Sequence, residues 1–146
     1  MKISKTGLEL IKRYESFSGT AYICPAGKKT IGYGHTGQHV NDGVITEKRA
    51  CEILDEDCNN AEDAVNHYVK VPLSQNQFDA LVSLVFNIGA GAFKQSTLLR
   101  MLNDKYYIAA AEQFRRWVYS DKKKLDGLVT RRKAEEILFL KKEKAP

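Results

Sequence analysis

A chain of 146 residues is long enough to bury one hydrophobic core and too short for two independent domains. Its hydrophobic (43%) and charged (28%) fractions are those of an ordinary globular protein, which excludes a disordered chain. The net charge of +5 favours anionic partners, among which nucleic acid and anionic polymers are alternatives, although a solvated lysine-rich surface also explains it.

No apolar run reaches the ~18 residues of a membrane-spanning helix, and residues 1–7 lack the apolar segment of a signal peptide. We therefore expect no membrane span and accumulation in the cytoplasm of the cell that makes the protein. The odd number of cysteines, three, argues against a disulfide framework. Cys51 and Cys58 are separated by about 10 Å of helical rise, too far for a bridge, and we expect both to be small buried apolar residues. No histidine–cysteine set indicates a metal site, and we expect no cofactor.

The first predicted element is a helix over residues 4–17. Leu8, Ile11 and Glu15 fall at i, i+3 and i+7, so one helical face carries two aliphatic side chains and then a carboxylate. A stop signal at residues 18–20 ends the helix close after Glu15. The negative end of the helix macrodipole and partial burial both favour a protonated carboxyl group, as a general acid requires. An ordinary surface glutamate is the alternative interpretation.

A β ribbon is predicted next, up to about residue 35. Residues 20–23 form a short strand, Pro25-Ala26-Gly27 indicate a turn, and residues 28–33 form a second strand. Thr30, Gly32 and Gly34 alternate onto one face, and the glycines there let another group approach the backbone closely. A bulge or bend explains the glycines equally well.

The remainder of the chain is predicted to be helical. After a loop over residues 36–45, Thr46 caps a long helix that reaches about Tyr68. Ser74 and Gln77 form a capping-box pattern ahead of an apolar helix that Gly89 to Gly91 break. Further helices are expected over residues 96–103, 106–119 and 128–142, with a charged loop at residues 121–124.

One spacing, from the first helix into the ribbon, is specific. Cys24 follows Glu15 after eight intervening residues, Thr30 follows Cys24 after five, and Ile31-Gly32-Tyr33-Gly34-His35-Thr36 comes next. This pattern resembles the signature of the phage-type lysozymes, the endolysins of glycoside hydrolase family 24. Similar segments follow in the same order, so the resemblance covers nearly the whole chain: residues 71–81, 86–89 and 96–100, Trp117, and residues 127–135.

The resemblance implies a single lysozyme-like domain of the α+β class, mostly α, over residues 1–146. A small N-terminal lobe with the first helix and the β ribbon (1–45) is joined by a long helix (46–68) to a helical C-terminal lobe (69–146), with the cleft between the lobes.

The resemblance also implies hydrolysis of the β-1,4 bond between N-acetylmuramic acid and N-acetylglucosamine in bacterial peptidoglycan. Glu15 would protonate the leaving oxygen, and a water held by Thr30 would attack the opposite face of the oxocarbenium ion. Many relatives have an aspartate where this chain has Cys24. The thiol could be a thiolate base, a covalent nucleophile or a polar bystander, so inversion and retention both stay open.

Other site residues follow from the same resemblance. Gly34, Phe86 and Asn87 would contact substrate, and His35 would pair with Asp57 to tie the ribbon to the long helix. Two basic residues of the last helix could orient Glu15, contact substrate or form a solvated face; these are Arg131 and Arg132.

Two alternatives remain beside this endolysin hypothesis: a lytic transglycosylase acting on the same bond, and a non-catalytic basic protein that binds wall or nucleic acid. On the leading hypothesis the partner is peptidoglycan and not nucleic acid. We expect a monomer that waits in the host cytoplasm until a separate holin-type pore releases it.

Overall fold

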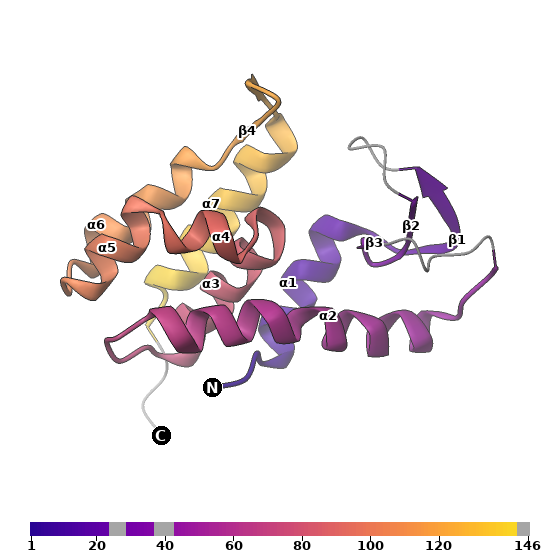
Figure 1. Ribbon diagram of the computed structural model, residues 1–146, viewed down its shortest axis with the longest axis horizontal. Helices are drawn as coiled ribbons and strands as arrows, with labels where there is room; N and C mark the ends of the chain where they lie inside the picture. The colour runs from indigo at the N-terminus through magenta and orange to yellow at the C-terminus, as the bar shows by residue number, and fades with distance from the viewer. Residues whose placement is uncertain (24–28, 37–42, 143–146) are drawn as a thin grey trace.

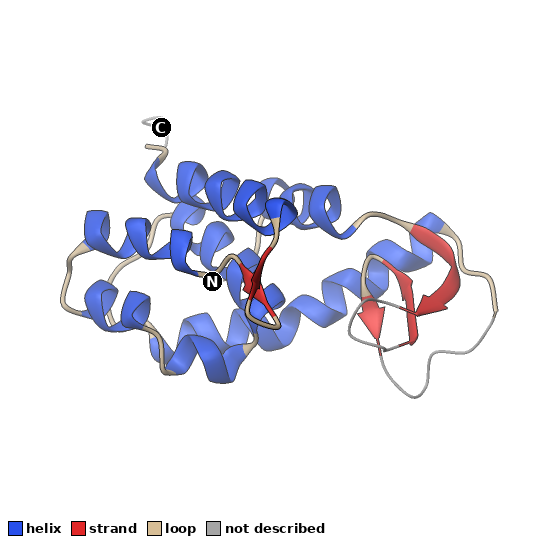
Figure 2. Ribbon diagram, turned by 90° about the horizontal axis from the view of Figure 1, so that it is seen from above, coloured by secondary structure: helices blue, strands red, loops and turns tan. Residues whose placement is uncertain are grey.

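The computed structural model describes residues 1–23, 29–36 and 43–142. A small antiparallel sheet lies at one end and a group of helices at the other, with α2 running between them (Figures 1 and 2). The α+β, mostly α fold expected from the sequence is confirmed. The elements are α1 (Lys5–Glu15), β1 (Ser18–Ile23), β2 (Lys29–Gly32), β3 (His35–Thr36), α2 (Glu47–Tyr68), α3 (Gln75–Ile88), α4 (Ala90–Lys94), α5 (Thr97–Asn103), α6 (Tyr107–Glu112), η1 (Gln113–Arg116), β4 (Tyr119–Ser120), β5 (Lys123–Lys124) and α7 (Asp126–Leu140).

The start of α1 is fixed by two buried carboxylates from other helices. The backbone N–H of Ile3 donates to Glu62 of α2 at 2.7 Å. The backbone N–H of Ser4 donates to Asp79 of α3 at 2.9 Å, and the Ser4 hydroxyl donates to the same carboxylate. These bonds satisfy N–H groups that a helix start leaves without intrahelical partners. They also set the position of the other end of α1, where Glu15 lies.

The sheet has the order β1-β2-β3 and is antiparallel throughout. In the central strand, Thr30 pairs with Tyr22 of β1 and with Thr36 of β3. The prediction of two strands is therefore incomplete, because the chain reverses after Gly32 and adds a third. The predicted turn at residues 25–27 lies outside the described residues.

Helix α2 begins as the sequence predicts. The Thr46 side chain accepts a hydrogen bond from the backbone N–H of Arg49 at 3.1 Å, and one largely apolar face of the helix is buried. The capping box of α3, formed by Ser74 and Gln77, is also confirmed. A small core beneath the sheet and a larger core around α3 are bridged by Phe86, which packs against both.

The predicted break of the helix at Gly89 is confirmed, and a short helix, α4, follows it. Three predictions about the second half of the chain are wrong in detail. The helix predicted over residues 106–119 is α6 followed by a 3₁₀ turn, η1. The charged loop at residues 121–124 is part of a hairpin, β4–β5, whose turn residues Asp121 and Lys122 have φ of 50° and 65°. Such positive values are those of a tight hairpin turn. Helix α7 begins at Asp126, two residues before the predicted start.

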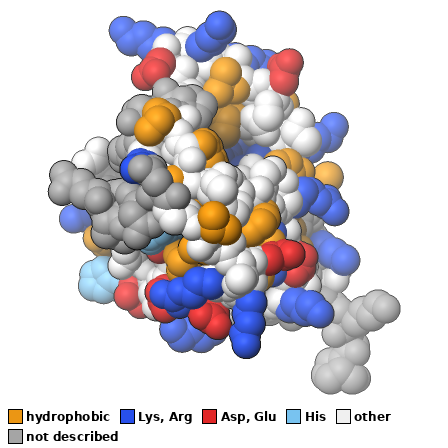
Figure 3. Space-filling view, turned by 90° about the vertical axis from the view of Figure 1, so that its right-hand side faces the viewer, with side chains coloured by type: hydrophobic (Ala, Val, Ile, Leu, Met, Phe, Trp, Pro, Cys, Tyr) orange, Lys and Arg blue, Asp and Glu red, His pale blue; other side chains and the backbone are white. Residues whose placement is uncertain are grey.

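The end of the molecule that carries the sheet exposes hydrophobic side chains. Tyr22, Ile23 and Val44 are all exposed there. On this face hydrophobic side chains lie in the middle, with Lys and Arg side chains around the edge (Figure 3). None of the helices in the described ranges is long and apolar enough to cross a membrane.

Candidate active site

Glu15 lies at the C-terminal end of α1, against the turn that joins β2 to β3. A Cβ atom built on Gly34 would collide with Oε2 of Glu15 and lie 3.2 Å from its Cδ. Gly34 also has φ of 75°, which favours glycine over residues with a side chain. The glycine therefore brings the carboxylate directly against the sheet.

Arg131 of α7 holds the same carboxylate from the other side. Its Nη1 donates to Oε1 of Glu15 at 2.7 Å. The Arg131 side chain is 4% exposed and that of Glu15 is 20% exposed. The solvated basic face considered for this helix is therefore wrong for Arg131, which orients Glu15.

The Glu15–Arg131 pair belongs to a larger buried cluster of charges. Oε2 of Glu135 accepts from Arg131 Nε at 3.3 Å and from the Ser83 hydroxyl at 2.5 Å, and Oε1 accepts from Arg132 Nη1 at 2.6 Å. Burial raises the pKa of Glu135, whereas the two guanidinium groups and the hydroxyl act in the opposite direction. Burial likewise lowers the pKa of Arg132, against the attraction of Glu135. The two negative charges of the cluster, on Glu15 and Glu135, are therefore balanced by the two positive charges of Arg131 and Arg132.

The sheet positions Thr30 in its central strand, where the residue is 2% exposed. The glycine face predicted beside it is filled partly by the protein itself. A Cβ on Gly32 would lie 3.3 Å from the Cβ of Ala50 in α2, and Gly34 is covered by Glu15. Cys24, the third residue of the predicted catalytic set, lies outside the described residues.

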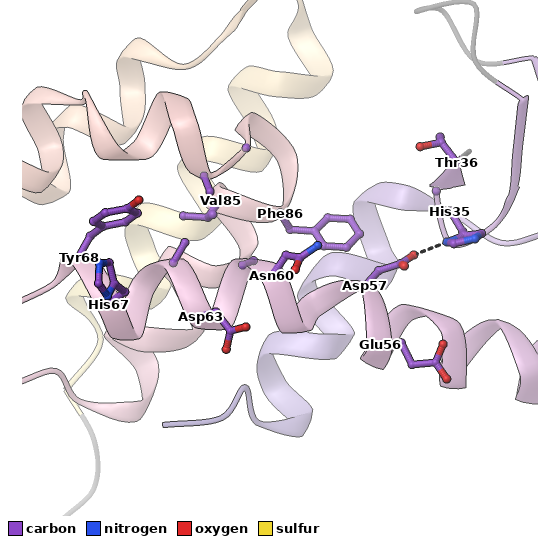
Figure 4. Close-up of a pocket in the computed structure, with 15 residues that line it drawn as sticks. His35, Thr36, Glu56, Asp57, Asn60, Asp63, His67, Tyr68, Val85 and Phe86 are labelled. Carbon is purple, nitrogen blue, oxygen red and sulfur yellow. Dashed lines mark hydrogen bonds and ion pairs between the residues drawn. The ribbon is translucent and has the colours of Figure 1, made fainter. Parts of the chain in front are cut away.

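A cleft of about 760 Å³ begins beside Gly34 and follows α2 (Figure 4). Two of the three predicted substrate contacts, Gly34 and Phe86, line it. The third, Asn87, is absent from the described lining and accepts a hydrogen bond from Arg132 through its side-chain oxygen. The polar side of the cleft lies on α2 and was not predicted from the sequence: Asn60, Asp63 and His67. Their spacing of i, i+3 and i+7 marks one helical face and could have identified them.

A hydrogen-bonded contact joins the sheet to α2 at the mouth of this cleft. His35 Nδ1 of β3 lies 2.7 Å from Asp57 Oδ2 of α2 (Figure 4). The two side chains are 17% and 27% exposed, so solvent reaches both. The contact connects residues 22 positions apart and fixes the β3 end of the ribbon on the long helix.

The two described cysteines are free thiols. Cys58 is completely buried in α2, and burial raises the pKa of its thiol to about 12. A thiol in such a site is unreactive. Cys51 is only partly buried, so the expectation of two buried residues is correct for one of them. Within residues 1–23, 29–36 and 43–142, no group of His, Cys, Asp or Glu side chains is arranged to hold a metal ion.

Comparison with known proteins matches this architecture to one family. The phage lysozyme family model matches residues 12–135. An endolysin of Acyrthosiphon pisum secondary endosymbiont phage 1 is 49% identical over 95% of this chain and 98% of its own length. The muramidase domain of SpmX from Asticaccaulis excentricus is 41% identical, with a TM-score of 0.90 over 97% of this chain and 99% of that one. A lysozyme variant of phage P22 is 46% identical, with a TM-score of 0.87 over the same shares.

These matches confirm the resemblance and the lysozyme-like fold that the Glu15 to Thr36 stretch predicts. They span most of this chain and nearly all of the relatives. The buried Glu15 cluster and the cleft along α2 therefore lie within a shared architecture. The chain belongs to the phage lysozyme family, a family of lysozyme-type hydrolases.

Proposed function

We propose that this protein is an endolysin that hydrolyses the β-1,4 bond between N-acetylmuramic acid and N-acetylglucosamine in peptidoglycan and thereby lyses bacterial cells. The observation that carries the proposal is the placement of Glu15. Its carboxylate is partly exposed and lies between Arg131 on one side and Gly34, a residue that lines the cleft, on the other. Family membership and relatives named as endolysin and muramidase support the same activity.

In this mechanism Glu15 is the general acid that protonates the leaving glycosidic oxygen. The Arg131 hydrogen bond occupies Oε1, so Oε2, which faces Gly34, is the oxygen we assign to proton donation. Fixing the carboxylate in one rotamer reduces the entropy that must be lost on reaching the transition state.

Thr30 is proposed to hold the attacking water through its hydroxyl group. Cys24 is the third residue of the proposed catalytic set. A hydrolase that inverts the sugar needs a water on the face opposite its acid, whereas a retaining enzyme needs a nucleophile there. The thiol of Cys24 could serve as thiolate base, nucleophile or polar bystander, and substitution distinguishes these roles.

The test is the loss of turbidity of bacterial cells stripped of their outer membrane. Wild type should lyse the cells, and Glu15→Gln, which keeps the shape but not the acid, should not. Thr30→Val removes only the hydroxyl and should lose most of the activity, while Thr30→Ser should retain it. Lysis by Glu15→Gln at the wild-type rate would overturn the assignment of the acid.

The activity of Cys24→Ser, measured with and without reductant, shows which role the thiol has. Full activity makes Cys24 a bystander, and complete loss that Cys24→Asp restores makes it a base or nucleophile. Product mass then tests the alternative chemistry, because hydrolysis adds one water to each cleaved bond and a lytic transglycosylase adds none. An anhydro product would replace the hydrolase proposal.

Three further expectations belong to this proposal. They are release from the host cytoplasm through a holin-type pore, action as a monomer, and division of the chain into lobes at residues 1–45, 46–68 and 69–146. Light scattering of the purified protein tests the second directly, since a dimer would double the measured mass.

A further inference from the structure

The net charge of the protein is concentrated near its C-terminus. Residues 115–142 contain ten Lys and Arg residues and four Asp and Glu residues, whereas the rest of the chain contains 13 and 14. This segment therefore carries a net charge of +6 and the remainder −1. A charge asymmetry of this size indicates a surface that attracts anions.

The same segment encloses a second hollow, of about 880 Å³, between η1, the β4–β5 hairpin and α7. The hairpin and α7 lie next to each other in Figure 1. Apolar side chains of Val118, Val129 and Ile137 form part of its lining. Three basic side chains, Arg116, Lys124 and Lys133, lie around them. The combination is an apolar depression with a cationic rim.

The carboxylate that lines this hollow does not neutralise those three cations. Glu136 is bound by Arg115, whose Nε and Nη2 donate to its two oxygens at 2.8 and 2.7 Å. A two-pronged pair of this kind satisfies both partners. Arg116, Lys124 and Lys133 are all exposed, so their charges are presented to solvent.

Exposed apolar side chains surround the same place. Tyr119 on β4 is 61% exposed and Ile137 on α7 is 60% exposed, and Leu140 lies one helical turn beyond Ile137 at 44%. A surface designed only for a polyanion would have no use for these side chains. Cations next to exposed apolar groups are the combination that binds proteins to the interface of an anionic bilayer.

We propose that this basic–apolar surface, defined by Arg116, Tyr119, Lys124, Lys133 and Ile137, docks the protein on membranes that contain anionic phospholipids. The three cations bind phosphate groups, while Tyr119 and Ile137 enter the boundary between headgroups and acyl chains. The surface contains none of the residues assigned to catalysis. Docking is therefore separable from cleavage of the wall.

The experiment is co-sedimentation of the full-length protein with vesicles of phosphatidylglycerol and phosphatidylcholine, or of phosphatidylcholine alone. The test variant combines Arg116→Gln, Lys124→Gln and Lys133→Gln. A matched control combines Lys48→Gln, Arg100→Gln and Lys105→Gln, which removes the same charge from exposed positions elsewhere. Ile137→Ser tests the apolar contribution without changing the charge.

Wild type should bind the anionic vesicles only. The test variant should partition about 100-fold more weakly, since each cation near the surface contributes about a fivefold factor, and the control should stay closer to wild type. Ile137→Ser should weaken vesicle binding and leave binding to duplex DNA unchanged. All variants should digest purified peptidoglycan at the wild-type rate, which separates this proposal from the proposed function.

Three results would overturn the docking proposal. Equal vesicle binding by the test variant and the matched control would show that only total charge matters. DNA binding as strong as vesicle binding, with no effect of Ile137→Ser, would make the surface a general polyanion site. Absence of any vesicle binding by wild type would overturn it at once.

Discussion

Gly34 and Glu15 are in direct contact where the sheet meets the end of α1, and no side chain fits between them. Glycine is favoured at this position for two reasons: a side chain would collide with Glu15, and the φ of 75° disfavours other residues. The turn after β2 therefore limits where the Glu15 carboxylate can lie.

Replacing Gly34 by alanine should therefore displace Glu15. We expect kcat/KM on peptidoglycan to fall about 100-fold, because misplacement of a catalytic group by about 1 Å has effects of that size. The free energy of unfolding should fall by about 1 kcal/mol or more, because alanine is strained at this φ. Gly91→Ala is the control, since nothing lies within 4 Å of its added methyl group. Equal activity of the two variants would contradict the positioning role.

Removing Arg131 should destabilise the protein severely. Arg131→Met leaves Glu135 and Glu15 without one cation in a buried site, and loss of one member of a buried ion pair costs about 3–5 kcal/mol. The comparison is Arg49→Met, whose exposed pair with Glu52 at 3.1 Å should contribute no more than about 1 kcal/mol. Urea unfolding of both variants measures the difference. Similar costs for the two would mean that the buried cluster is not a source of stability.

Alkaline conditions should weaken the fold through Cys58. Its pKa is raised from 9.0 to about 12 in the folded protein, so the unfolded chain loses this proton first. The contribution is complete below pH 9 and is lost as pH rises toward 12, by about 1.4 kcal/mol per pH unit. Wild type should therefore lose stability more steeply than Cys58→Ala across this range. Parallel pH profiles of unfolding free energy would disprove it.

The His35–Asp57 contact should couple the sheet to α2. A double-mutant cycle with His35→Gln and Asp57→Asn should give a coupling energy of about 1–2 kcal/mol, as for a hydrogen bond that involves a charge. Additive effects of the two single mutants would show that the contact is energetically neutral.

Local signals in the sequence predict much of this fold. The caps at Thr46 and Ser74 locate two helices, because a side chain there must satisfy free N–H groups. The hairpin β4–β5 is not predicted, because its sequence has no such local signal. Its strands have two residues each, too few for a pattern, and Asp121 and Lys122 take positive φ without a glycine.

In the candidate site, too, some residues are predicted from the sequence and others are not. Glu15 and Thr30, 15 positions apart, are predicted from their spacing, whereas the residue that holds Glu15 lies 116 positions away. Arg131, Arg132 and Glu135 look like a solvated face of α7, since buried charges and exposed charges have the same sequence pattern. Only the fold shows that they pair with one another in the interior.

The distance along the chain between Glu15 and Arg131 also sets an order of events during synthesis. A ribosome adds about 5–20 residues per second, so Glu15 leaves it roughly 6–23 seconds before its guanidinium partner is made. During that interval α1 can form, yet its carboxylate has no anchor on α7. The arrangement that we propose for catalysis is completed only when the last helix docks, so a nascent or prematurely terminated chain has Glu15 but cannot hold its carboxylate in place.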